Sequence, residues 1–219
     1  MNDLLRRRRA MMKQAESGLP SAYRQVEYIE GTGTQYIDVV AESGAWDFDV
    51  TIAVSLPAVN AYNLFCGYSY WSDSAAHCIF WTSNQTDIRR KNNGQSHNAQ
   101  VSTSSIAGRK CRFILNSARA AIIDAETGEI LSENTDQYVR ASANYIRLFR
   151  GASNSGGYER PVAAKMYEYK AYTNTGALAY DFIPCVRNAD GEIGVYDLIG
   201  KQFYSNSGTG EFLIGPDVN

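Results

Sequence analysis

The sequence predicts an all-β domain of two packed antiparallel sheets, a β-sandwich or jelly roll, with a short helix at its N-terminus. Short apolar runs with period-2 alternation recur along the chain, and turns rich in Gly and Asn separate them. The 219 residues include 15 Tyr and 18 Gly but only 5 Pro, which suits strands and tight turns. This length is enough for one large sandwich with its own core.

Residues 1–17 differ from the rest of the chain and predict a short amphipathic helix. Leu4 and Leu5 recur seven positions later as Met11 and Met12, so these four apolar side chains share one face. A helix of this length is marginal alone, because isolated helices below about 12–15 residues are barely stable in water. The apolar face therefore favours an ordered state in which something covers it.

Three roles for this segment stay open: a disordered solvated tail, a helix that docks on a partner or on its own copies, and nucleic-acid contact through its arginines. The formal charge of the whole chain is only −2, which gives no general reason to expect nucleic-acid binding. We expect a docking anchor, formed by Leu4, Leu5, Arg6, Arg7, Arg8, Arg9, Met11 and Met12.

Gly18-Leu19-Pro20-Ser21 is the expected linker, because Gly and Pro both end a helix. The chain then divides into an N-terminal basic helical anchor and linker, residues 1–18, and a sandwich domain, residues 19–219.

The first strands are predicted at 26–29 and 34–39, on either side of Gly31-Thr32-Gly33. The same triplet recurs at 208–210, again before an apolar strand. The first and last strands should therefore use the same kind of turn, lie near each other and close the fold together.

Residues 48–56 give the clearest strand signal of the chain. Thr51 and Ser55 should point outward, while the alternating apolar residues form one inward face. The inward residues are Phe48, Val50, Ile52, Val54 and Leu56.

Further strands are expected in order along the middle of the chain. Residues 62–70 and 78–82 are rich in aromatic residues, residues 86–91 predict a polar edge or outer strand, and residues 92–98 form a polar loop with a hairpin-type Asn-Gly. Residues 111–116 and 120–124 predict a hairpin that a turn links to 129–131, and 145–149 predict a strand. Residues 163–172 carry apolar groups on both faces, which favours a central strand covered on both sides.

The C-terminal region predicts a meander. Residues 179–183 alternate and should end at Pro184, which lacks a backbone N–H. Asn188 to Gly191 and Ser207 to Gly210 predict turns. Short strands are expected at 193–198, 202–204 and 211–214.

Two patterns carry a family resemblance. The C-terminal pattern DFIP-x-x-RN-x-DG-x-x-G-x-YD…FY-x-N-x-GTG-x-F begins at Asp181, and the run from Tyr28 to Asp38 precedes it. Together they resemble a lectin-like domain common in bacteriophages and prophages of gut bacteria, over roughly 19–219. The resemblance implies a concanavalin A-like (LamG-like) β-sandwich and a phage setting.

The sequence gives little support to several other classes of protein. It holds no apolar run long enough for a membrane span and no secretory signal, so we expect synthesis in the host cytoplasm and release by lysis. The four cysteines lack paired spacing, which predicts buried free thiols rather than a disulfide or a zinc site.

Catalysis and metal binding are the weaker interpretations. Asp47 and Asp49 alternate like the carboxylates of laminarinase-type glucanases, but a third acid is missing and both should point to solvent. His77 and His97 lie in no nucleophile motif. The 188–192 loop lacks the spaced acids of a calcium loop. We expect no enzyme and no cofactor, and calcium at that loop is the alternative that the LamG resemblance keeps open.

A sugar site needs an exposed aromatic platform beside planar polar groups. Such residues occur at a predicted strand end and in the polar loop after it, and core or turn roles for them stay open. The candidate ligand-binding residues are Tyr68, Tyr70, Trp71, Asp73, Asn92 and Asn93.

We therefore expect a non-enzymatic bacteriophage virion structural protein: a tail fibre, tail or capsid-decoration component that carries a lectin-like, carbohydrate-binding module. Its partners would be other virion proteins, reached through the N-terminal anchor, a host or environmental glycan, and its own copies in a homo-oligomer. A purely architectural module without a ligand and a glycan hydrolase of the glucanase type are the alternatives.

Overall fold

The chain is almost entirely β in the residues that the computed structural model describes, which are 18–39, 46–54, 63–69, 75–82, 84–92, 94–138, 146–153 and 161–218. The expected N-terminal helix and anchor lie outside them. In chain order the described elements are β1 (Tyr23–Gln25), β2 (Ile29–Thr32), β3 (Ile37–Asp38), β4 (Asp47–Val54), β5 (Asn63–Ser69), β6 (Ala75–Trp81), β7 (Gln85–Asn92), β8 (Gln95–Ser96), β9 (Ala99–Ser102), a short helix α2 (Thr103–Ile106), β10 (Cys111–Leu115), β11 (Ala120–Asp124), β12 (Ile130–Asn134), β13 (Arg147–Leu148), β14 (Ala152–Ser153), β15 (Ala163–Tyr172), β16 (Leu178–Arg187), β17 (Ile193–Asp197), β18 (Gln202–Ser205) and β19 (Leu213–Ile214).

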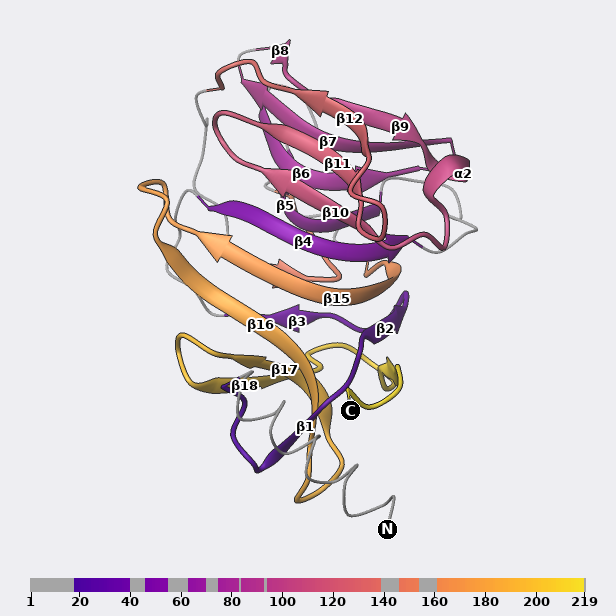
Figure 1. The fold of residues 1–219 in the computed structure, drawn as a ribbon, viewed down its shortest axis with the longest axis vertical. Coiled ribbons are helices and arrows are strands. Elements are labelled where there is room, and N and C mark those ends of the chain that lie inside the picture. Colours follow the sequence, from indigo (N-terminus) through magenta and orange to yellow (C-terminus); the bar gives the residue numbers. More distant parts are fainter. Residues whose placement is uncertain are drawn as a thin grey trace.

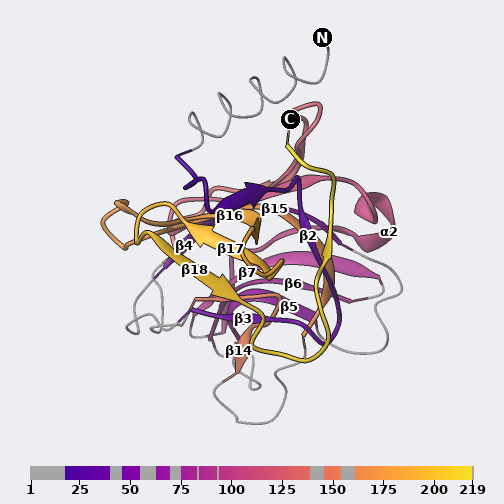
Figure 2. The ribbon, with the colours of Figure 1, turned by 90° about the horizontal axis from the view of Figure 1, so that it is seen from below.

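Two large sheets lie face to face (Figures 1 and 2). The larger sheet runs β12-β11-β10-β4-β15-β16-β17-β18 and is joined by β1, β2 and β19, whereas the smaller runs β14-β5-β6-β7-β8 with β9 beside β7. Paired strands are antiparallel, apart from the parallel pair β14 and β5. Strands β3 and β13 form a separate antiparallel pair. The expectation of packed antiparallel sheets with almost no helix in the domain is confirmed at this level.

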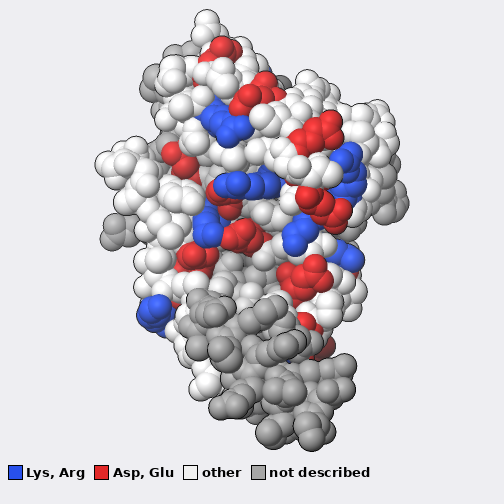
Figure 3. Space-filling view, viewed as in Figure 1, with Lys and Arg blue, Asp and Glu red and all other residues white. Residues whose placement is uncertain are grey.

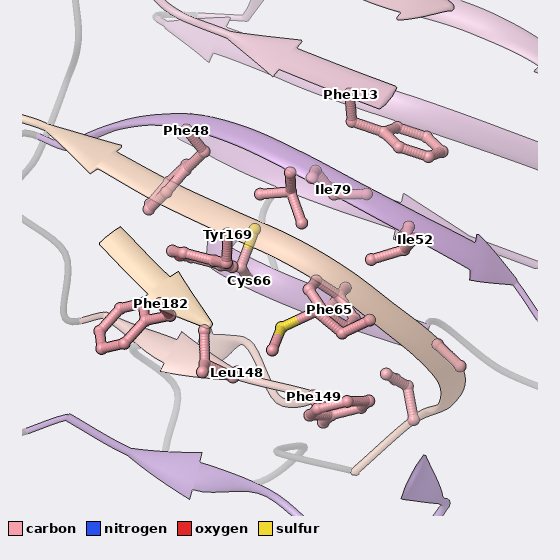
Figure 4. Close-up of a cluster of buried hydrophobic side chains, with 14 of the residues drawn as sticks. Phe48, Ile52, Phe65, Cys66, Ile79, Phe113, Leu148, Phe149, Tyr169 and Phe182 are labelled. Carbon is pink, nitrogen blue, oxygen red and sulfur yellow. The ribbon is translucent and has the colours of Figure 1, made fainter. Parts of the chain in front are cut away.

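The core fills the space between the two sheets. The predicted inward face of β4 is confirmed, because Phe48, Val50, Ile52 and Val54 are all buried; Leu56 and Ser55 lie outside the described residues. These side chains meet Phe65, Cys66 and Ile79 of the smaller sheet in one apolar cluster (Figure 4). All four cysteines are buried free thiols, as predicted.

Thr51 points outward, as predicted, and is nevertheless buried. Only 6% of its surface is exposed. On the outer face of the sheet it lies between Arg112 of β10 and Glu168 of β15, its direct cross-strand neighbours. Long side chains on both sides of a short one remove it from water even on an open sheet face.

Strand β15 is central, as predicted, but it is not covered on both sides. A bulge between Met166 and Glu168 shifts the alternation, so that Tyr169 rather than Glu168 follows Met166 on the core face. The Tyr169 hydroxyl there faces the Cys66 thiol (Figure 4). The other face of β15, including Tyr167, is only partly buried and belongs to the outer surface of the larger sheet.

Strand β7 was predicted to be a polar edge or outer strand; it is polar, but it is not an edge strand. It pairs with β6 on one side and with β8 and β9 on the other. Its polar side chains are buried because partners satisfy them: Thr86 bonds to Thr103 at 3.0 Å, and Arg90 makes four hydrogen bonds. The predicted Asn-Gly hairpin joins β7 to β8, and Gly94 has φ +81°.

Several predicted strand boundaries need correction. The first strands are β1 and β2, and Gly31-Thr32 belongs to β2, where it pairs with β15, instead of separating two strands. Pro184 lies inside β16 rather than at its end. Along one edge of β16, pairing with β15 ends at Phe182 and pairing with β1 begins at Cys185. Pro184 lies between these two partners, so no neighbouring strand needs a hydrogen bond from the N–H that proline lacks. The hairpin β10–β11 is confirmed.

The two ends of the domain meet, as the repeated Gly-Thr-Gly triplet predicted. Strand β19 pairs with β2. The Thr209 N–H donates to the Thr34 carbonyl at 3.2 Å, and the Gln35 side chain donates to the Glu211 carbonyl at 3.0 Å. Gly208 permits this approach, because a Cβ there would overlap the carbonyl oxygen of Thr34.

The predicted linker is part of the domain. Leu19 is 4% exposed and packs with Cys185 and Tyr196 in a second apolar cluster. The Asn188 side chain donates to the Ser21 carbonyl at 3.0 Å. Leu19 and Ser21 are therefore tied to β16, to β17 and to the turn between them, which the Gly and Pro of the linker do not predict.

Among the described helices, none is long and apolar enough to cross a membrane.

Candidate functional site

Most residues predicted to bind a ligand lie outside the described part of the chain. These are Tyr70, Trp71, Asp73 and Asn93. The anchor residues from Leu4 to Met12 also lie outside the described part. Only the backbone of Tyr68, at the end of β5, is described, whereas Asn92, at the end of β7, is described with its side chain.

The register places these two positions at the same end of the smaller sheet. Strand β6 runs between them: Tyr68 lies opposite His77, and Asn92 lies opposite Ala75. Residues 134–138 join this end from the larger sheet, since Tyr138 bonds to the β6 and β7 backbones. We call this end the strand-end rim and define it by Asn92, His97, Asn134, Asp136 and Tyr138.

Tyr138 fastens the rim to the smaller sheet. Its hydroxyl lies 2.9 Å from both the Ala76 carbonyl oxygen of β6 and the Lys91 carbonyl oxygen of β7. Its ring stacks on His77 with centroids 5.9 Å apart and an interplanar angle of 12°. The side chain is buried, so it holds the segment in place rather than offering a surface to a ligand.

Arg90 lies beneath the rim as a fully buried cation. Its guanidinium donates to the carbonyls of His97, Asn116 and Asn134 at 2.9, 3.1 and 3.0 Å, and to the Asn134 side chain at 2.6 Å. Burial lowers the pKa of Arg90, while the nearby Asp136 opposes this shift. Such a network fixes the backbone on which the exposed rim residues stand.

The rim presents a pair of planar polar groups, an exposed Asp136 and a partly buried His97. His97 Nδ1 lies 3.4 Å from Asp136 Oδ2, and the Asn134 amide donates to the same oxygen at 3.2 Å. The Asn134 and His97 hydrogen bonds lower the pKa of Asp136. The pair therefore presents an ionised acceptor beside an imidazole in fixed geometry, which suits hydrogen bonding to neighbouring hydroxyl groups.

The sequence did not identify this pair. His97 and Asp136 lie 39 positions apart, and His97 was interpreted only as a histidine outside any catalytic motif. The usable signal was its place in the polar loop with an Asn-Gly turn, but only strand register brings Asp136 to that loop.

The two acids considered for catalysis do not form a pair. Asp49 accepts two hydrogen bonds from Arg112, at 2.8 and 2.5 Å. Asp47 lies 3.7 Å from His77 of the opposite sheet, with 13% of its side chain exposed. The prediction that both point to solvent is wrong for Asp47, whereas Asp49 lies on the outer face of the sheet and is partly exposed. Each acid contacts a different basic side chain, so the two do not form the carboxylate pair that glycoside hydrolysis uses.

In the loop considered for calcium, one arginine side chain binds the carboxylates. Arg187 bonds to both oxygens of Asp190, at 3.0 and 3.1 Å from Nε, and pairs with Glu192. The Arg187 contact lowers the pKa of Asp190. Within the described ranges, no group of three or more His, Cys, Asp or Glu is placed to hold a metal.

A second surface, which the sequence analysis missed, lies on the outer face of the larger sheet. It is a depression of about 820 Å³ over β4, β10, β15 and β16, which we call the outer-sheet depression. Figure 3 shows acidic and basic side chains alternating across the middle of this face. Its charged lining is Glu27, Asp49, Lys110, Arg112, Asp124, Glu168, Lys170 and Asp181.

Comparison with known proteins assigns the chain to no family: no protein-family model matches it, and no curated protein matches its sequence.

Proposed function

We propose that this chain is a bacteriophage virion structural protein, a fibre, tail or capsid-decoration component, and that its domain is a concanavalin A-like jelly roll that binds glycans at the strand-end rim without hydrolysing them. The proposal rests on two kinds of support: the resemblance of the terminal patterns to phage lectin-like domains, and the geometry of the rim.

The resembling C-terminal pattern supports the fold part of the proposal. Its residues have structural roles: Asp197 is buried and accepts from the backbone N–H groups of Asp181, Ile199 and Gly200 at 2.8 to 3.1 Å. The pattern would thus indicate a shared meander and say nothing about a ligand. Support for a ligand comes from the rim.

The His97–Asp136 pair carries the binding part of the proposal. Sugars are recognised by fixed planar polar groups that bond two neighbouring hydroxyls, and here the buried Arg90 network holds such a pair before a ligand arrives. Binding at one such site is weak. Many copies on a particle would supply the affinity through avidity.

The placement of the β4 acids favours binding over hydrolysis, and the glycan array described below separates binding from a purely architectural role. Asp49 is held by Arg112 on a sheet face away from the rim and Asp47 faces His77, so the two alternating acids of β4 do not share a site.

A glycan array probed with the full chain tests the binding proposal. The variant His97→Ala with Asp136→Asn should lose at least about 90% of the signal on any glycan bound by the parent protein. Asp217→Asn, which removes an exposed arginine-paired carboxylate elsewhere, is the matched control and should leave the signal unchanged. Equal binding by both variants, or no glycan bound, would reject the rim as a lectin site.

Two further measurements test the non-enzymatic assignment and the virion assignment. Release of reducing sugar from host polysaccharide would overturn the non-enzymatic assignment. Mass spectrometry of purified virions should detect this chain at a stoichiometry typical of structural proteins, and its absence from particles would overturn the virion assignment.

A further inference from the structure

The outer-sheet depression ends where the described chain begins. Leu198 and Ile183 line one end of it, and an added Cβ on Gly18 would lie 3.9 Å from Leu198 Cδ2. Leu19 is held in the apolar cluster with Cys185 and Tyr196. The described chain therefore begins beside the depression, at a fixed point.

Gly18 has the conformation of a residue that follows a helix. Its φ is +72°, in the left-handed region that glycine adopts at the C′ position of a helix C-terminus. A helix over residues 1–17 would be about 25 Å long. This is long enough to cross several strands at about 4.8 Å each.

The depression complements the charge of this segment. Its lining has five carboxylates and three cations, a net charge of 3 − 5 = −2, and Arg109 from outside the lining pairs with Asp124. The three cations already have partners: Arg112 holds Asp49, Lys170 pairs with Glu168, and Lys110 lies 4.2 Å from the Tyr167 ring centroid. Residues 1–17 carry five basic and two acidic residues, a net charge of +3.

The depression also offers partly exposed apolar groups to the Leu and Met face of the segment. Ile123, Ile183 and Leu198 line it between the charged residues. Asp181 stands beside Ile183 in β16, and burial raises its pKa although the neighbouring Lys170 opposes the shift. A cation placed next to Asp181 would lower its pKa again.

We propose that residues 1–17 of the same chain dock as a helix in the outer-sheet depression, with the apolar face toward Ile183 and Leu198 and the arginines among the carboxylates. The covalent link at Gly18 makes this contact intramolecular, so that a weak interface suffices. The rim lies at the end of the other sheet and stays accessible. The inference is therefore independent of the proposed glycan binding.

Limited trypsin digestion of the full chain tests the docking, because the segment offers cleavage sites at Arg6 to Arg9 and Lys13. A docked population of about 90% slows cleavage about tenfold relative to a free segment. Glu168→Lys with Asp181→Lys should remove this protection. Glu133→Lys, a reversal at an exposed ion pair on β12, is the matched control and should retain it.

A second variant distinguishes loss of docking from misfolding of the domain. Leu5→Asp with Met12→Asp changes only the segment and should abolish protection equally, with an unchanged thermal melt. Protection that appears only as concentration rises would mean that a second copy is the occupant and would overturn the proposal. Cleavage that is fast in the parent protein, or slow in all variants, would overturn it as well. Neither result bears on the glycan array.

Discussion

At the scale of single residues, the fold depends on positions where one strand backbone touches another. Gly67 in β5 has φ +83°, and an added Cβ would overlap the carbonyl oxygen of His77 in β6. Gly94 has nearly the same backbone, φ +81°, but stands in open space. The two glycines thus share a conformational requirement and differ in steric room.

Alanine substitutions at these glycines should separate the two effects. Gly94→Ala should cost about 1–2 kcal/mol of unfolding free energy, the strain of a left-handed Ala. Gly67→Ala adds a collision with backbone and should cost at least about 3 kcal/mol. Urea unfolding followed by circular dichroism measures both. Equal losses would mean that β5 and β6 can separate freely at His77.

A single carboxylate should govern part of the acid stability. Asp124 accepts the backbone N–H groups of Thr127 and Glu126 at 2.8 and 2.9 Å and pairs with Arg109. These contacts, the Thr127 hydrogen bond above all, lower the pKa of Asp124 from 3.8 to about 2. A lowered pKa in the folded state stabilises the protein above the ordinary pKa, and this contribution is lost as pH falls from about 4 to 2.

Thermal melts across this pH range test the role of Asp124. Asp124→Asn should lower the melting temperature at neutral pH and flatten the decline between pH 4 and 2. Glu126→Gln, in the same turn, should follow the parent protein. An unchanged slope in Asp124→Asn would assign the acid sensitivity to other carboxylates, such as Asp136 and Asp190, whose pKa values are also lowered.

At the scale of elements, strand alternation predicted the features that depend only on residues close together in the chain. It located the inward face of β4 and the hairpin β10–β11, because a period of two and a turn are local properties. It failed for β7, whose polar residues suggested an edge, because burial of Arg90 depends on carbonyls up to 44 positions away. The Pro184 position and the β15 bulge were missed for the same reason: both depend on where a neighbouring strand ends.

The rim shows the same limit for the candidate site. The sequence grouped Tyr68 and Asn92 in one candidate site, and the strand register brings both to the same end of the smaller sheet. It could not add Asp136 or Tyr138, which arrive from a segment that carries no motif of its own.

Arg90 links three elements, and its removal should be costly. In Arg90→Leu the carbonyls of His97, Asn116 and Asn134 lose their donor in a buried site. The expected loss is about 3–5 kcal/mol of unfolding free energy. Arg119→Leu, at a surface pair with Glu133, should cost no more than about 1 kcal/mol. Comparable losses in chemical denaturation would show that the Arg90 network contributes little.

At the scale of the whole molecule, the two chain ends form one closing unit. Strand β19 pairs with β2, and the turn before it bonds to Thr34. Deletion of residues 207–219 should therefore abolish cooperative unfolding and expose apolar surface to a dye such as ANS. Deletion of residues 1–17 is the control and should leave a cooperative melt. A soluble 1–206 protein with a sharp transition would refute the closing role of this segment.

The pairing of β2 with β19 also sets an order of events during synthesis. Ile29 and Ile214 are cross-strand neighbours, yet 185 positions separate them (214 − 29). At about 5–20 residues per second, β2 leaves the ribosome roughly 10–40 s before its last partner exists. During this interval the edge of β2 that will pair with β19 is open. The contact that covers it spans most of the chain, and such long-range contacts slow the folding of β-rich proteins. Nascent chains of this domain should therefore rely on chaperones that hold exposed strands until termination, and slower translation would lengthen that dependence.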